Sequence, residues 1–520
     1  MLPLRGLKVE GLIVNGPELK GDCEMVNLGK KLEKEILGIL CDTVYKGKFI
    51  SIHVKKSRFK KLLRETKKMI RYFCENHRDV LVKESRFFSR KGRISLETLV
   101  YFFLQLGAKS LKCNLDEFRK MLPEDVTLSG LCQKRDKLSI NGIIELLRAM
   151  NRFFSRGYTK TYKRLRILAV DGTDISIITN PEDTASYFNS SSKAKDKEHS
   201  KKGFNMCHLT AFYDVLTHTY VDAVFSPRRD SSERRDLADL LNNLKRGMDS
   251  SPFPKEPKNL ILADRGFECL DLLLMVADID QYFLFRAKSP SCCNSILHNR
   301  DLPDEPEEFD VDRVIDVCRR KKTPSKLRPD GYGYVGYKEG TVRNPTRVFK
   351  FRIIKCKLAS KDRNGKPQYE YLVTNLPREE FDLNEIHELY WKRWGIESSF
   401  KTLKHTLAGI YFHSEDRERL AKEMWFSLIR ANLFNRLADE FYVENKSNNG
   451  KKYALDFKLF ASRCYSLLRK NITIDELLEM KCDSYREVKG YRSYPPKIAG
   501  TGRQAIAESS GRLKITKMHR

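Results

Sequence analysis

The chain has 520 residues, and its 98 Lys and Arg residues outnumber its 69 Asp and Glu residues, which gives a formal net charge of +29. This excess predicts a polyanionic partner, while 13 scattered cysteines without a CxxC pair argue against a disulfide framework or a zinc site. The longest apolar runs are too short to cross a bilayer and no signal-peptide pattern is present, so we expect a cytoplasmic protein outside the membrane.

Residues 1–160 are predicted to be mainly helical. Apolar residues recur at helical spacing from Ile140 onward, and Ser139 is placed to cap that helix. The preceding segment, 127–138, is basic, so a short helix, a turn and a longer helix fit a pair that reads a DNA groove. An ordinary helical hairpin fits the same pattern equally well.

Two apolar runs further along each end in an aspartate that a glycine follows within two residues. Arg164–Asp171 and Asn259–Asp264 are typical of buried strands that stop at the acid, where the glycine lets the backbone turn sharply. A carboxylate buried beside a core strand is costly unless something pairs with it, and hard divalent cations suit several converging carboxylates. Asp174 is expected to serve a turn or a cap, and His208 to be structural.

The segment 161–288 alternates strands and helices. After the first strand, the predicted elements are strands at 207–213 and 219–225, a helix at 232–245, the strand ending at Asp264, a helix at 269–278 and a strand at 282–288. This order, with a late acidic helix in 385–440, predicts an α/β fold with an RNase H-like mixed sheet flanked by helices. The stretch 289–384 is too long for a loop, so we expect a β-rich insertion domain there. A helical region and a basic tail are expected at 441–520.

A single helix is predicted across residues 390–404. At 3.6 residues per turn, Tyr390, Arg393, Glu397 and Lys404 fall on one stripe, beside an apolar seam that would dock the helix on a core. One acid together with Arg, Lys and Tyr suits a metal-dependent site that also binds a polyanion. An ordinary Glu–Arg pair on a solvated helix face gives the same pattern.

The acids and the helix residues together match a known catalytic signature in order and spacing. The matching motifs are Asp171-Gly172, Asp264-Arg265-Gly266-Phe267 and Tyr390-x2-Arg393-x3-Glu397-x6-Lys404. They resemble the DDE transposases of bacterial insertion sequences, in particular the insertion-sequence-4 family, which the Tyr-Arg-Glu-Lys pattern marks. The resemblance covers roughly residues 160–440. It implies an enzyme that cleaves DNA at the ends of an insertion sequence and transfers the strand to target DNA.

The resemblance also implies cofactors and partners. Asp171, Asp264 and Glu397 would be the catalytic residues and would bind two divalent ions, Mg²⁺ or Mn²⁺, in a two-metal mechanism. Double-stranded DNA would be the partner, both as element ends and as target, and two copies would act as a homodimer in the DNA complex. The expected phosphate contacts are Tyr390, Arg393 and Lys404, with Arg265, Arg286 and Lys288 as a second tier.

The same resemblance assigns roles to the flanking regions. Residues 1–160 would bind the element ends, and the helices of 441–520 would help to pair two protomers in a bacterial, nucleoid-associated protein. Two alternatives share the fold. A metal-dependent nuclease that cuts without joining would have every residue named above, whereas a domesticated DNA-binding protein would have lost an acid. All three acids are present, which counts against the second alternative.

Overall fold

The computed structural model describes residues 50–488, apart from gaps at 91, 124–125, 156–159, 189–202, 250–256, 299, 304–306, 362–364, 366, 406–410, 446–451 and 480–484. The predicted basic tail after residue 488 lies outside the described residues. No helix within the described ranges is long and apolar enough to span a membrane.

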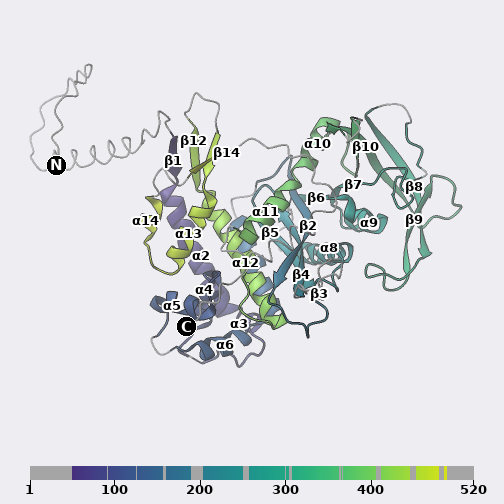
Figure 1. The fold of residues 1–520 in the computed structure, drawn as a ribbon. Helices are drawn as coiled ribbons and strands as arrows, with labels where there is room; N and C mark the ends of the chain where they lie inside the picture. The colour runs from purple at the N-terminus through teal and green to yellow at the C-terminus, as the bar shows by residue number, and fades with distance from the viewer. Residues whose placement is uncertain are drawn as a thin grey trace, which may run out of the picture.

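A mixed sheet forms the centre of the molecule (Figure 1). Its central strands are β2 (Leu165–Ile177), β4 (Phe204–Asp214), β5 (Thr219–Pro227), β6 (Lys258–Ala263) and β7 (Tyr282–Ala287). β4 lies antiparallel between β2 and β5, while β6 runs parallel to β2 and β7 runs parallel to β6. The order β5-β4-β2-β6-β7 confirms the predicted RNase H-like sheet. A short strand, β3 (Tyr187–Phe188), also pairs with β4.

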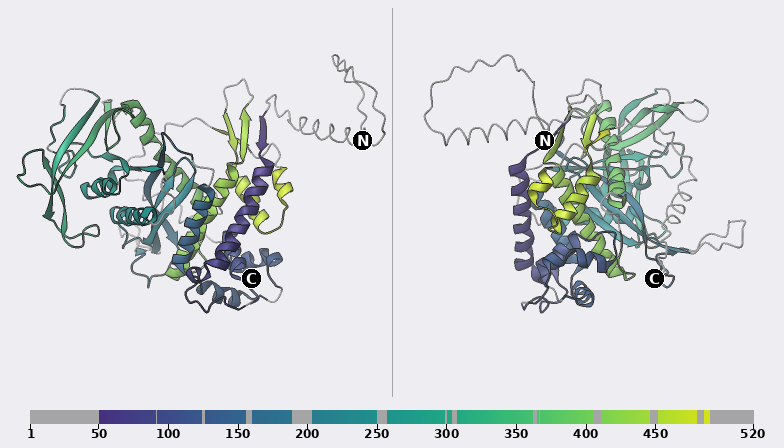
Figure 2. Two further views of the ribbon diagram at one scale, coloured as in Figure 1. Left: turned by 180° about the vertical axis from the view of Figure 1, so that it is seen from behind. Right: turned by 60° about the vertical axis from the view of Figure 1, so that its left-hand side comes forward.

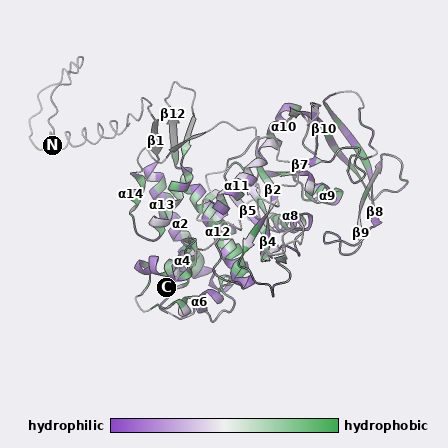
Figure 3. Ribbon diagram, viewed as in Figure 1, coloured by the Kyte–Doolittle hydropathy of each residue, from purple (hydrophilic) through white to green (hydrophobic). Residues whose placement is uncertain are grey.

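Helices cover both faces of this sheet because its strands are apolar on both sides. The covering helices are α8 (Glu233–Asp249) and α9 (Leu270–Asp278) on one face, and α7 (Ile140–Ser155), α10 (Leu383–Trp391), α11 (Trp394–His405) and α12 (Arg417–Ala438) on the other. Along β2, Leu168 and Val170 pack on the first face, whereas Ile167 and Ala169 pack on the second. This alternation follows from the two-residue period of a strand. Figure 3 shows hydrophobic residues along these central strands.

The β-rich segment predicted after residue 288 forms strands that extend the central sheet. These strands are β8 (Phe309–Lys321), β9 (Tyr332–Lys338), β10 (Arg347–Lys361) and β11 (Pro367–Thr374). β11 pairs antiparallel with β7, and the order then continues through β10 and β8 to β9. The added strands project to one end of the molecule, at the right of Figure 1 and at the left of the first view in Figure 2.

The beginning and the end of the described chain pack together at the opposite end. The elements there are β1 (Ile50–Val54), α2 (Lys56–Asn76), α3 (Arg78–Leu81), α4 (Leu96–Leu104), α5 (Leu111–Glu117), a 3₁₀ turn (Arg119–Met121), α6 (Leu128–Asp136), β12 (Phe441–Asn445), β13 (Lys452–Leu455), α13 (Phe457–Leu468), α14 (Ile474–Leu478) and β14 (Tyr485–Val488). β1 pairs with β12, and β13 pairs with β14. The N-terminal region is therefore mainly helical, as predicted, and the C-terminal segment completes its small sheet.

The predicted helix after Ser139 is α7, and its sides are largely covered. Ser139 Oγ accepts from Gly142 N at 3.4 Å, as expected for the cap. Asn151 Nδ2 donates to the carbonyl oxygen of Tyr220 on β5 at 2.9 Å, and Arg148 Nη2 lies 3.1 Å from an Asp222 carboxylate oxygen. These contacts make α7 a packing helix between the N-terminal helices and the sheet, which favours the ordinary hairpin over a groove reader.

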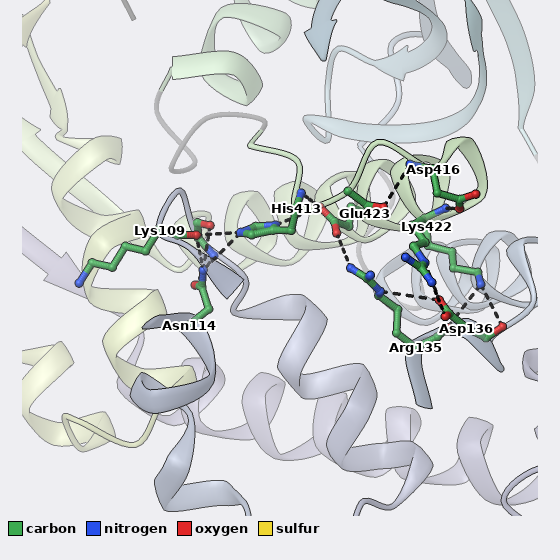
Figure 4. A network of polar contacts seen from close by, with 11 residues as sticks. Lys109, Asn114, Arg135, Asp136, His413, Asp416, Lys422 and Glu423 are labelled. Atoms are coloured by element: carbon green, nitrogen blue, oxygen red, sulfur yellow. Dashed lines mark hydrogen bonds and ion pairs between the residues drawn. The ribbon is translucent and has the colours of Figure 1, made fainter. Parts of the chain in front are cut away.

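A buried polar network ties α12 to the N-terminal helices (Figure 4). Glu423 accepts from Arg135 Nη1 at 3.3 Å and lies 3.0 Å from His413 Nδ1, and His413 Nε2 lies 2.8 Å from the carbonyl oxygen of Lys109. Lys422, fully buried, directs its ammonium group at carbonyl oxygens in the last turn of α6. Buried charges persist only when they are paired in this way.

Candidate active site

Asp171 and Asp264 lie side by side where the parallel pair β2–β6 ends. The last residues in register are Val170 and Ala263, and each acid comes next in its chain. The prediction that the first strand stops at Asp171 is wrong, because β2 continues to Ile177. β4 supplies pairing partners along this extra length, so the strand does not need to turn. Beyond the end of β6, the β2 segment after Asp171 pairs only with β4, so its other edge has no strand partner among the described residues beside the two acids.

The continued strand also gives Asp174 a different environment from the one expected. Asp174 does not serve a turn or a cap: its Oδ1 lies 2.6 Å from His208 Nδ1 and 2.7 Å from Arg228 Nε. Arg228 follows β5, so this cluster joins three strands on the face covered by α8. Burial alone lowers the pKa of His208, but Asp174 and Glu233 outweigh burial and raise it above the ordinary value. The structural role predicted for buried His208 agrees with these contacts.

The helix predicted at 390–404 is broken into α10 and α11. Arg393 N donates to Tyr390 O at 3.0 Å and Gly395 N donates to Lys392 O at 2.9 Å, so tight bonds between residues three apart replace the α-helical ladder. The single helix of the prediction is therefore wrong. Gly395 packs close to Val215, where an added Cβ would approach a valine methyl carbon to 3.3 Å. The break places Arg393 just before α11, with Glu397 one turn further on.

The side chain of Arg393 brings two of the acids together. Its Nη1 lies 3.0 Å from Glu397 Oε1 and 3.8 Å from Asp171 Oδ2. Burial opposes the charge of this guanidinium, yet Asp264, Glu397 and Asp171 contribute to a net rise in its pKa. The Trp394 ring lies beneath it, with 4.9 Å from Cζ to the ring centroid. The arginine therefore stays charged at the point where α11 meets β2.

Asp264 is contacted from α10 and β7. The Tyr390 hydroxyl donates to Asp264 Oδ1 at 3.4 Å, and Arg286 Nη1 lies 3.9 Å from the same oxygen. Burial raises the pKa of Tyr390 well above its ordinary value, so the phenol remains a donor. Arg286 also lies 3.8 Å from Glu370 Oε2 on β11. The structure thus places Tyr390 and Arg286 beside the second acid.

Of the other predicted phosphate contacts, Lys404 and Arg265 lie beside the predicted catalytic acids in the fold, whereas Lys288 is paired with a different acid. Lys404 Nζ donates to Thr173 Oγ1 and to Asp174 O, both at 2.6 Å, which fastens α11 to β2 just beyond Asp171. Arg265 follows Asp264 directly and is exposed. Lys288 instead has its ammonium 3.6 Å from a carboxylate oxygen of fully buried Glu268.

Sequence reasoning missed one acid in this region. Glu233, in the first turn of α8, directs its carboxylate toward Gly172 and Gly266, the glycines that follow Asp171 and Asp264. A weak signal was available in the sequence, because the helix that follows the third strand begins with an acid. Nothing in the linear spacing connected that acid with the other three.

The chemistry of the donors suits a hard divalent cation. Burial raises the pKa of Asp171 to about 6, although the Gly172 backbone and Arg393 act in the opposite direction. Asp171, Asp264 and Glu397 are 23%, 37% and 30% exposed, so ions from solvent can reach all three. Within the described ranges no three His, Cys, Asp or Glu side chains stand in a coordinating cluster, and Arg393 lies between two of the acids. Because burial outweighs the attraction of Arg393 and keeps the pKa of Asp171 raised, a bound cation would offset the charge that Arg393 leaves uncompensated.

Comparison with known families decides the class of protein. The family model for the transposase DDE domain matches residues 162–433, which run from β2 through α12 and include all three acids. The chain belongs to the DDE transposase family. Transposases of this family generally use divalent metals and act on DNA. No curated protein matches the sequence.

Solved structures that are similar to this chain include a transposase. It is a piggyBac transposase in a synaptic complex with hairpin DNA, seen by cryo-EM, and it is 12% identical to this chain. The alignment covers 85% of this transposase and 84% of that chain, with a TM-score of 0.37.

Proposed function

We propose that this transposase is of the insertion-sequence-4 type, and that it cleaves DNA at the ends of its element and joins the freed strand to target DNA. The observation that supports this most directly is the meeting of Asp171 and Asp264 at the end of two parallel strands, with Glu397 joined to Asp171 through Arg393. These acids come from two strands and a late helix, in the order of the family signature. Their catalytic role is the core of the proposal.

The three acids would hold two divalent ions, Mg²⁺ or Mn²⁺. When bound, such ions lower the pKa of an attacking water or 3′-hydroxyl and stabilise the leaving oxygen. Arg393, buried between Asp171 and Glu397, keeps the two carboxylates in place and limits their mutual repulsion. The hydroxyl of Tyr390 orients Asp264 from the other side.

Cations around the acids would bind the DNA backbone. Lys404 has three donors, and the two hydrogen bonds it makes go to neutral acceptors, so its charge remains available to a phosphate. Arg286 and Arg265 flank Asp264 and extend the cationic surface. Arg393 and Tyr390 would contact phosphates close to the cut, and Lys288, engaged by Glu268, would contribute least.

The N-terminal helices would recognise the element ends. Helix α2 buries Phe59, Leu63, Ile70 and Phe73 on one side. Its opposite side is lined by exposed cations, namely Arg58, Lys60, Lys61, Arg64, Lys67, Lys68 and Arg71. Figure 2 shows α2 at the edge of the molecule. A cationic helix face at this place suits the phosphate backbone of a duplex. Two copies acting together on two ends remain part of this proposal.

A plasmid assay tests the proposed chemistry. The substrate is a supercoiled plasmid with the DNA that flanks the gene, incubated with purified protein and Mg²⁺ or Mn²⁺. Glu397→Gln keeps the size of the side chain and a hydrogen bond to Arg393 but removes the charge. Glu388→Gln, at an exposed acid on α10, is the matched control. We expect metal-dependent excision and joining in wild type and Glu388→Gln, and a loss of at least about 100-fold in Glu397→Gln.

The assay also separates the second candidate function. Hydrolysis and strand transfer use the same acids, so the site itself does not distinguish a metal-dependent nuclease from a transposase. The products do, because a nuclease would yield cut DNA without joined products. Equal activity of Glu397→Gln and wild type would refute the assignment of the acids. Cleavage without joining, on substrates with pre-cut ends as well, would replace transposition by nuclease activity.

A further inference from the structure

The first turn of α8 directs a fourth carboxylate at the place where β2 and β6 part. A methyl group at Gly172 would lie 2.5 Å from Glu233 Oε1, and one at Gly266 would lie 3.6 Å from Glu233 Oε2. One oxygen therefore faces the residue after Asp171, and the other faces the turn after Asp264.

The glycine at position 172 keeps this approach open. β2 runs straight through Gly172, which pairs with Thr210, so the glycine is not there to make a turn. A Cβ at this position would come within 2.4 Å of His208 Nε2 as well as 2.5 Å of Glu233 Oε1. Any other residue would fill the space that these two polar groups occupy against the strand.

His208 faces Glu233 from the strand side. Its side chain is 3% exposed, and Nδ1 is engaged by Asp174, which Arg228 holds in turn. Nε2 lies 3.4 Å from Glu233 Oε1, within ion-pair distance, and Glu233 contributes to the raised pKa of His208. One oxygen of Glu233 therefore pairs with His208, while the other faces Gly266, the second residue after Asp264.

Helix α8 is anchored just after this glutamate by two hydrogen bonds. Arg234 Nε donates to Gly266 O at 2.9 Å, and Thr210 Oγ1 donates to Asp236 Oδ2 at 2.8 Å. The start of α8 is thereby fixed to β4 and to the turn that follows β6. Glu233 itself is 39% exposed, so its carboxylate remains accessible to an ion from solvent.

We propose that Glu233 is a fourth acidic residue of the active site and supplies an oxygen ligand to a divalent cation bound with Asp171 and Asp264. This inference deepens the proposed function and rests on it. Hard cations bind carboxylate oxygens and keep several water ligands. A fourth carboxylate would therefore strengthen cation binding, and the water ligands could still be replaced by phosphate oxygens of DNA. Glu233 approaches the end of the β2–β6 pair from the α8 face, whereas Glu397 approaches it from the α11 face.

Direct cation binding in the absence of DNA tests the proposal. Mn²⁺ binding to the full-length chain is followed by EPR of the free ion. Glu233→Gln keeps the side-chain size and a possible contact with His208 but removes the charge, and we expect Mn²⁺ affinity to fall at least about ten-fold. Its melting temperature in EDTA should stay within about 2 °C of wild type or rise. Asp239→Asn removes an exposed charge on the same helix, where Asp239 pairs with Arg235, and should bind Mn²⁺ like wild type.

The variants separate this inference from the function on which it rests. Wild-type affinity in Glu233→Gln, together with weak binding in Glu397→Gln, would overturn the role of Glu233 and leave the proposed function standing. Equally weak binding by wild type and Glu397→Gln would refute the metal site itself. Should Glu233→Gln fail to fold, Glu233→Asp, which withdraws the oxygens by one methylene, is measured instead. Weakened binding then supports the proposal, and wild-type binding overturns it.

Discussion

Replacing Asp171 by asparagine should stabilise the metal-free protein at neutral pH. Burial raises the pKa of this carboxyl from 3.8 to about 6 in the folded chain. The folded state therefore binds the proton more tightly than the unfolded state does, and stability falls as pH rises from about 4 to about 6. A shift of roughly two units corresponds to about 3 kcal/mol at pH 7.5. Asparagine carries no charge, so the variant escapes this penalty.

Urea unfolding in EDTA measures the effect. At pH 7.5 we expect Asp171→Asn to be more stable than wild type by about 2–3 kcal/mol, and the difference to shrink toward zero near pH 4. Asp183 is the opposite case, because its ion pair with Arg417 lowers the pKa of Asp183. Asp183→Asn should therefore destabilise the protein at pH 7.5, and this loss should disappear as pH falls below the ordinary aspartate value.

The outcome that would refute this reasoning is specific. If Asp171→Asn were less stable than wild type at pH 7.5, the attraction of Arg393 would outweigh burial, and the carboxylate would be a stabilising element. A gain that stayed the same at pH 4 would show that the effect comes from packing rather than ionisation. Adding Mg²⁺ to wild type should recover part of the difference, because a bound cation compensates the buried charge.

Two further predictions concern packing away from the site. Glu423→Ala leaves Arg135 buried without its carboxylate and should lower the free energy of unfolding by about 3–5 kcal/mol, measured by urea unfolding; a loss below about 1 kcal/mol would show that water takes the place of the carboxylate. Gly142→Ala would bring a Cβ within 2.2 Å of Val80 O and should destabilise by at least about 1–3 kcal/mol. Gly247→Ala on α8, where no heavy atom lies within 4 Å of the added Cβ, is its control and should be neutral or stabilising; equal losses in both would refute the clash.

The sequence by itself determined the features that local patterns encode. Apolar runs predicted the strands that carry Asp171 and Asp264, since strands covered on both faces read as continuous hydrophobic segments. The alternation of strands and helices predicted the RNase H-like sheet, and the order of the three acids pointed to the DDE transposases, whose domain model matches residues 162–433. Ser139 marked the start of α7 because capping is a local interaction.

Only the tertiary structure decided how those segments meet. β2 continues past Asp171 because β4 pairs with it, and the helix before Glu397 breaks where Gly395 packs on Val215. Strands β8–β11 join the central sheet because β11 pairs with β7, and no local sequence pattern predicts that pairing. Glu233 stands beside Gly172 although 61 positions separate them in the chain. Such contacts depend on strand pairing and helix packing between distant segments, and a linear pattern records only which residues are apolar, charged or able to turn.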